Sequence, residues 1–215
     1  MSEPSAEEIV DFWLGDAPSS PEAAEARRKV WYDGGAQLDA QIVHQFGASV
    51  EAACEGEWAA WESEPIGALA LIVLLDQFTR NIFRGTPRAY AGDERAWRVA
   101  NAAVDAGLHH ALSIPGQLFL FHPFHHHESL AGQDRSVALL EAIVAPPQWE
   151  AYVSARVQGF SRHRDIVARF GRFPHRNHTL GRADTPEAAA PLAGPHESFG
   201  QAQNAAPLSR EQHKA

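Results

Sequence analysis

The densest group of chemically active side chains in this 215-residue sequence directly follows an uninterrupted apolar run. The run 69–75 leads into Asp76-Gln77-Phe78-Thr79-Arg80-Asn81-Ile82-Phe83-Arg84. At about 100° per residue, Asp76, Arg80 and Arg84 fall on one side of a helix, and that side is apolar one or two turns earlier. A helix that is apolar all round is buried, and a buried charge needs a partner or a ligand. We therefore expect this polar patch to reach the interior or the mouth of a pocket.

A second basic group lies late in the chain. From Arg156 to Arg182 there are seven arginines and three histidines against one acid, Asp165, although the net charge of the whole sequence is −9. The overall charge argues against nucleic-acid binding, whereas a local excess of donors calls for an acceptor. We expect the two groups to meet around a small anionic or carboxylate-bearing molecule. The expected ligand-binding residues are Gln77, Arg80, Asn81, Arg84, Arg169, Arg172, His175, Arg176 and Asn177. The alternative is that these residues only brace a loop against the bundle.

Histidines and carboxylates suggest acid–base chemistry of the hydrolase type. His126 or His163 would move a proton, because histidine titrates near neutral pH, and a carboxylate would orient the ring. His126 and Glu128 are two residues apart and do not face each other on a helix, so the partner would come from elsewhere, for instance Asp76. The expected catalytic residues are Asp76, His126, Glu128 and His163. Asp165 and Arg169, four apart, are expected to form a plain ion pair.

Metal and cofactor binding are not expected. The run 122–128 contains four histidines and one glutamate, which suit zinc, but consecutive histidines seldom reach one ion and Pro123 restricts the backbone. Cys54 is the only cysteine, which excludes an internal disulfide and a cysteine cluster. The sequence also lacks a serine elbow, a phosphate-binding glycine loop and a His-Glu-x-x-His motif.

Helical periodicity extends through most of the chain, and no segment alternates as a strand does. Expected helices run from Ser5 to the Gly15 turn and over 21–32, 36–53, 65–84, 94–107 with Asp93 as N-cap, 117–121, 136–144 and 148–170. The stretch 122–129 is expected to be irregular or helix-terminal. Gly171–Asn177 is expected to cross the surface or to fold back over the bundle, and Thr185 to begin a short helix.

These elements predict an all-α protein, a single domain over 1–200 built from antiparallel helix pairs, with a disordered tail over 201–215. No apolar run reaches the roughly 18 residues of a membrane span, so we expect a soluble, cytoplasmic protein that binds no membrane. A competing functional class is an interaction module that binds a peptide or partner protein.

Two motifs carry a family resemblance. Residues 75–89, LDQFTRNIFRGTPRA, and residues 169–177, RFGRFPHRN, with Leu180-Gly181-Arg182, resemble the bacterial domain of unknown function 924 family. The similarity extends from Val10 to Phe199. It implies a tetratricopeptide-repeat-like helical fold and no established activity. Where the family usually has Pro-Phe-Met-His-Ser-Glu, this chain keeps His126 and Glu128 but departs at His125 and His127, which argues against an essential metal site.

Overall fold

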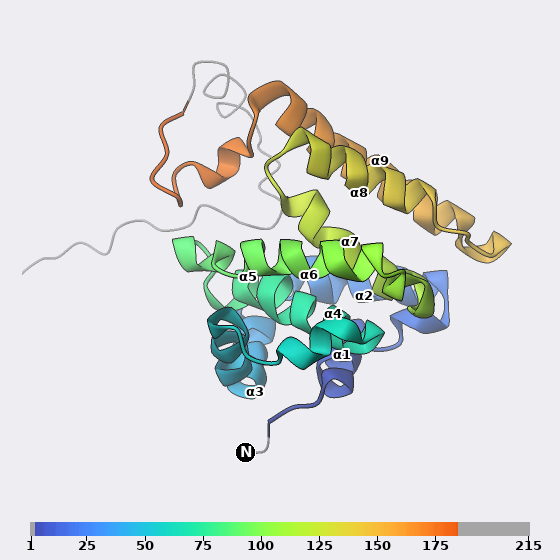
Figure 1. Cartoon of the computed structure of the whole chain (residues 1–215), viewed down its shortest axis with the longest axis horizontal. Coiled ribbons are helices and arrows are strands. Elements are labelled where there is room, and N and C mark those ends of the chain that lie inside the picture. Colours follow the sequence, from blue (N-terminus) through green and yellow to red (C-terminus); the bar gives the residue numbers. More distant parts are fainter. Residues whose placement is uncertain (1–2, 185–215) are drawn as a thin grey trace, which may run out of the picture.

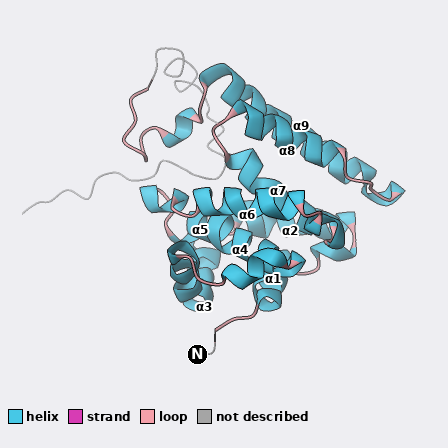
Figure 2. Cartoon of the chain, viewed as in Figure 1, coloured by secondary structure: helices cyan, strands magenta, loops and turns pink. Residues whose placement is uncertain are grey.

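The computed structural model describes residues 3–184, and every regular element within them is helical (Figures 1 and 2). The prediction of an all-α protein is confirmed. The longer helices are α1 Ala6–Leu14, α2 Pro21–Asp33, α3 Gly35–Glu55, α4 Pro65–Ile72, α6 Asp93–Asp105, α7 Ile114–His126, α8 Leu130–Glu141 and α9 Pro147–Phe170. The short helix expected at Thr185 and the tail over 201–215 lie outside the described residues.

Local sequence sets the helix ends. Ser5 caps α1 in a capping box, because its hydroxyl accepts from the Glu8 N–H and the Glu8 carboxylate accepts from the Ser5 N–H. Gly171 ends α9 in the left-handed region, at φ 68°, where a side chain would be strained. The chain therefore turns sharply after α9, and the segment that follows returns toward the bundle.

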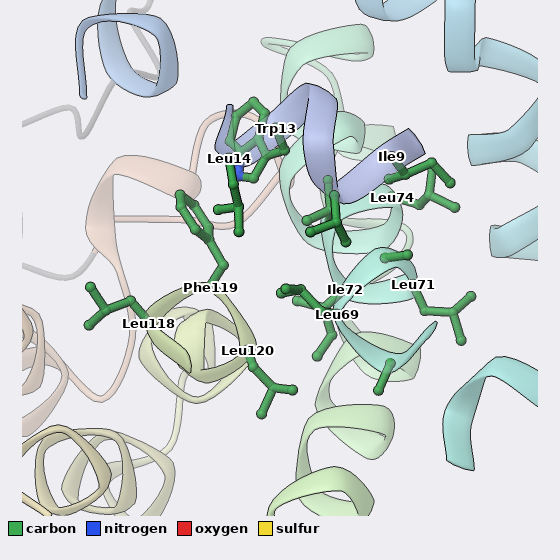
Figure 3. Close-up of a cluster of buried hydrophobic side chains, with 14 of the residues drawn as sticks. Ile9, Trp13, Leu14, Leu69, Leu71, Ile72, Leu74, Leu118, Phe119 and Leu120 are labelled. Atoms are coloured by element: carbon green, nitrogen blue, oxygen red, sulfur yellow. The ribbon is translucent and has the colours of Figure 1, made fainter. Parts of the chain in front are cut away.

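Helix α4 occupies the centre of the fold. Residues 68–75 are all buried, and α4 packs against α1, α6 and α7. Figure 3 shows Ile9 and Trp13 of α1 and Phe119 of α7 gathered around this helix. Pro65–Ile82 is the one described stretch with the length and composition of a membrane span, and 72% of it is buried inside the protein. A core helix of a globular protein explains that stretch.

The central helix changes its winding where the polar patch begins. Val73–Phe78 is π-helical and links α4 to the short helix α5, Thr79–Ile82. Such wide turns are rare and occur often at functional sites. Gly92, just before α6, touches this segment so closely that a Cβ there would lie 2.3 Å from the Leu75 carbonyl oxygen. Asp76 therefore sits in a widened turn at the centre of the molecule.

Helices α8 and α9 lie side by side above α7 in Figure 1. After α9, the chain packs back on the bundle, where Phe173 is fully buried and Asn177 is 1% exposed. The expectation that Gly171–Asn177 folds back is confirmed.

Three sequence-based boundaries were wrong. Helix α7 continues through Pro123 to His126, because one proline removes one donor and the apolar flanks remain buried. Helix α8 begins at Leu130, not at Ser136, with Ser129 as its cap. Asp93 is the first residue of α6 and not its N-cap, since its carboxylate is bonded to Arg80.

Candidate functional site

Asp76 and His126 form the centre of the site. Asp76 is fully buried, and Nδ1 of His126 lies 2.8 and 2.9 Å from its two carboxylate oxygens. Arg80 lies one turn further on, with Nη1 3.1 Å from Oδ1 of Asp76. Gln77 donates to Oδ2 of Asp76 at 2.5 Å. The carboxylate expected from elsewhere is therefore Asp76, and it orients the imidazole of His126.

The surroundings keep His126 neutral. Burial, reinforced by the positive charge of Arg80, lowers the pKa of His126 well below its usual value. The hydrogen bond to Asp76 assigns the proton to Nδ1, which leaves Nε2 as a lone-pair acceptor. His126 can therefore accept a proton at neutral pH.

The side chain of His126 lines a cavity of about 290 Å³, which we call the basic cavity. It lies between α2, the central helix, α7 and α9. Its lining residues are Arg28, Trp31, Tyr32, Gln77, Arg80, Asn81, Arg84, His122, His125, His126, Ala155, Arg156, Gly159, Phe160, Arg162 and His163. Among the described residues, it has five arginines and four histidines in its lining and no carboxylate. Such a cavity is suited to an anion.

His126 also borders a second cavity, of about 230 Å³, that we call the acidic cavity. Its lining residues are Asp76, Tyr90, Asp93, Glu94, Pro123, His126, His127, Glu128, Arg176 and Leu180. Burial, together with the nearby charge of Asp76, raises the pKa of Asp93 although Arg80 opposes this shift. The side chains of Asp76 and His126 therefore separate regions of opposite charge.

The central helix and the late basic segment, which were expected to meet, are joined through Asp93. Arg80 donates to both carboxylate oxygens of Asp93, at 3.0 and 3.1 Å, and Nη1 of Arg176 lies 3.8 Å from Oδ2. Arg176 is 6% exposed, and its Nε has no hydrogen-bond partner within residues 3–184. The central helix and the late loop are thus joined by two arginines that share one carboxylate.

Other predicted residues brace the loop. Glu128 accepts from the Phe173 N–H at 2.7 Å and from both Nη atoms of Arg182, so its carboxylate holds the loop instead of orienting His126. Asn177 donates to Asp184 at 2.9 Å. Asn81 and Arg84 both donate to Asp39, while they also line the basic cavity.

Four residues expected at the ligand lie outside both cavities: Arg169, Arg172, His175 and Asn177. The predicted ion pair between Asp165 and Arg169 is also wrong. Asp165 instead lies 3.4 Å from Arg164, and the guanidinium of Arg169 lies over the Phe170 ring. Helical spacing alone could not identify the partner of Arg169, because its long side chain can reach either the Asp165 carboxylate or the Phe170 ring.

The histidines pack as a stack of rings. The ring of His125 lies 3.8 Å from those of both Phe160 and His163. His163, one of the expected catalytic residues, lines the basic cavity, and burial lowers its pKa to about 4. Within residues 3–184, no group of three or more metal-ligating side chains has the arrangement of a metal site.

The sequence did not reveal the wall opposite the central helix. Arg28 in α2, and Arg156 and Arg162 in α9, line the basic cavity, but only the basic composition of the late segment pointed to the last two. Their spacing of six residues matches no simple motif. His125, which departs from the family pattern, is 6% exposed in the same wall, and its Nδ1 has no hydrogen-bond partner among the described residues.

The fold and the site define an all-α protein whose central helix divides a basic from an acidic cavity. The chain belongs to the family described as bacterial protein of unknown function DUF924, whose sequence profile matches residues 9–196. It is similar to the solved structure of a protein of unknown function from Agrobacterium tumefaciens, with 36% identity and a TM-score of 0.73 over 87% of this chain and 96% of that one. No match was found among curated proteins.

Proposed function

We propose that this protein is a cytoplasmic hydrolase that binds a small anionic molecule in the basic cavity and cleaves an ester bond in it. The observation that carries this proposal is the contact between Asp76 and His126, at 2.8 and 2.9 Å, in the wall of a cavity lined by five arginines. A neutral histidine held by a buried carboxylate is the arrangement that general-base catalysis needs.

The chemistry would use water as the nucleophile. Nε2 of His126 takes a proton from a water molecule, whose oxygen attacks the carbonyl carbon or phosphorus of the ester. Arg80 and Arg84, both in the cavity wall, stabilise the negative charge that develops on the attacked group. The imidazolium, stabilised by Asp76, then returns the proton to the leaving oxygen. Ester and water thus become acid and alcohol.

The surface gives less support to an interaction module. Among residues 3–184, the exposed large apolar side chains are Tyr32, Val43, Leu130 and Val144, which come from separate parts of the chain. The two tryptophans 58 and 61 stack on each other and pack against the core. A polar cavity is thus better supported than a broad apolar docking surface.

Hydrolysis of chromogenic esters tests the proposal. We expect turnover of p-nitrophenyl phosphate or mono-p-nitrophenyl succinate, and less of neutral p-nitrophenyl acetate. His126→Gln should lower kcat by about 10²- to 10⁴-fold with unchanged helical circular dichroism. His44→Gln, an exposed histidine of α3 outside both cavities, serves as the matched control. Anionic esters that bind but are not cleaved would refute hydrolysis, and absence of binding would refute the whole proposal.

A further inference from the structure

We propose that the anion recognised by the basic cavity is the doubly charged phosphate of an organic monoester, an inference that rests on the anion-binding function proposed above. Its basis is an imbalance of charge along the wall formed by α2 and α9. Arg28 and Arg156 both bond to Glu25, at 2.7 and 2.5 Å. Arg162 forms no ion pair within residues 3–184. The wall therefore carries three guanidinium groups and one carboxylate, which Arg28 and Arg156 share.

That imbalance matches a phosphate better than a carboxylate. A phosphate monoester carries about −1.5 to −2 charges at pH 7, whereas a carboxylate carries one. The side chain of Glu25 is 54% exposed, so water screens it, while that of Arg156 is only 16% exposed. The side chain of Arg28 is 41% exposed and Arg162 is also exposed, so water screens these charges as well. The wall still carries three arginines against one carboxylate, a formal excess of two positive charges that a dianion balances.

The cavity also has donors on more than one side. Arg80 of the central helix faces the cavity together with the arginines of α2 and α9, and His125 of α7 lies between them in the lining. His125 is 6% exposed and its Nδ1 lacks a hydrogen-bond partner within the described part of the chain, which is unusual for a buried polar atom. A phosphate has three oxygens that can accept from separate directions, whereas a carboxylate has two in one plane.

An organic group must accompany the phosphate. Trp31, Tyr32 and Phe160 line the same cavity and offer an apolar surface next to the arginines. The volume of about 290 Å³ exceeds what an inorganic ion needs. Beyond His126, the carboxylates of the acidic cavity would repel a second anion. The ligand class is therefore a small phosphate monoester whose other end is not negatively charged.

Isothermal titration calorimetry with phenyl phosphate and phenyl sulfate tests this inference, because the two probes share a shape and differ by one charge. At pH 7.5 and low salt, we expect phenyl phosphate to bind about tenfold more tightly. Arg162→Ala should remove most of that preference. Arg169→Ala is the matched control, since Arg169 is an exposed arginine of the same helix that lies outside the cavity. It should bind like the unmodified protein.

Equal affinities for the two probes, no binding of phenyl phosphate, or an Arg162→Ala variant with the original preference would each overturn the inference. The outcome is separable from that of the hydrolysis assay. A preference for phosphate without turnover of any ester supports the inference and refutes the hydrolase. The opposite result supports the hydrolase and refutes the inference. In that case the protein would cleave mono-p-nitrophenyl succinate, Arg162→Ala would leave this activity unchanged, and phenyl phosphate would bind no better than phenyl sulfate.

Discussion

The two cavities beside His126 differ in how their charges are matched. In the acidic cavity, Asp76, Asp93 and Glu128 are all bonded to arginines that hold helices and the late loop together. In the basic cavity, the arginines of α2 and α9 outnumber their carboxylate partners. The first set joins parts of the fold, while the second leaves positive charge without a matching carboxylate, which is the basis of the proposed anion site.

The largest expected effect comes from Asp76, which lines the acidic cavity and contacts His126 in the wall of the basic cavity. Asp76→Ala removes the partner of His126 and leaves Arg80 with Asp93 alone in a buried position. Loss of one partner from a buried ion pair should lower the free energy of unfolding by about 3 to 5 kcal/mol, measured by urea denaturation. Glu51→Ala, which breaks the exposed pair with Arg88, is the control and should cost about 1 kcal/mol or less. If the two variants were equally stable, Asp76 would have no structural role.

The buried histidines of the basic cavity predict a loss of stability in mild acid. Burial lowers the pKa of His163 to about 4, below its usual 6.5, so the unfolded chain binds the proton more readily. Stability from this residue is fully present above pH 6.5 and is lost as the pH falls from there toward 4. Between pH 7 and pH 5 the loss from His163 alone should be about 2 kcal/mol.

Urea denaturation at the two pH values measures this loss, and His163→Gln should reduce it by the same amount. Burial and Arg176 also lower the pKa of His175, to about 3, so the remaining acid sensitivity of that variant has the same sign. Ordinary carboxylates titrate below this window, and the raised pKa of Asp93 acts on stability in the opposite direction. A His163→Gln variant with undiminished acid sensitivity would show that the ring is not desolvated in the basic cavity.

Sequence patterns predicted the fold and half of the site. Apolar periodicity and turn residues located the central helix, the long α9 and the return of the late loop, because these depend on local propensity and burial. The run from Asp76 to Arg84 was expected to reach the interior or the mouth of a pocket; Asp76 and Asn81 are buried, whereas Arg84 is exposed. The π-helical turn at Val73–Phe78 was missed, since the apolar pattern there also fits an ordinary α-helix.

The rest of the site could not be read from one sequence. Arg156 reaches Glu25 across 131 positions, and no local pattern encodes such a contact, whereas Arg28 lies only three residues from the same glutamate. For the same reason, Glu128 was expected near His126 but braces Phe173 and Arg182. Residue types indicated an anion site, whereas the pairing of each charge required the three-dimensional arrangement.

The smallest expected effect distinguishes the two cavities most directly. Glu94 lines the acidic cavity, is exposed and makes no ion pair within residues 3–184. Glu94→Gln should therefore change the free energy of unfolding by less than about 0.5 kcal/mol. It should change the affinity for phenyl phosphate by less than about twofold, because water and salt screen an exposed charge on the far side of His126. Isothermal titration calorimetry with phenyl phosphate compares this variant directly with Arg162→Ala. A tenfold gain in affinity for Glu94→Gln would place the anion in the acidic cavity instead.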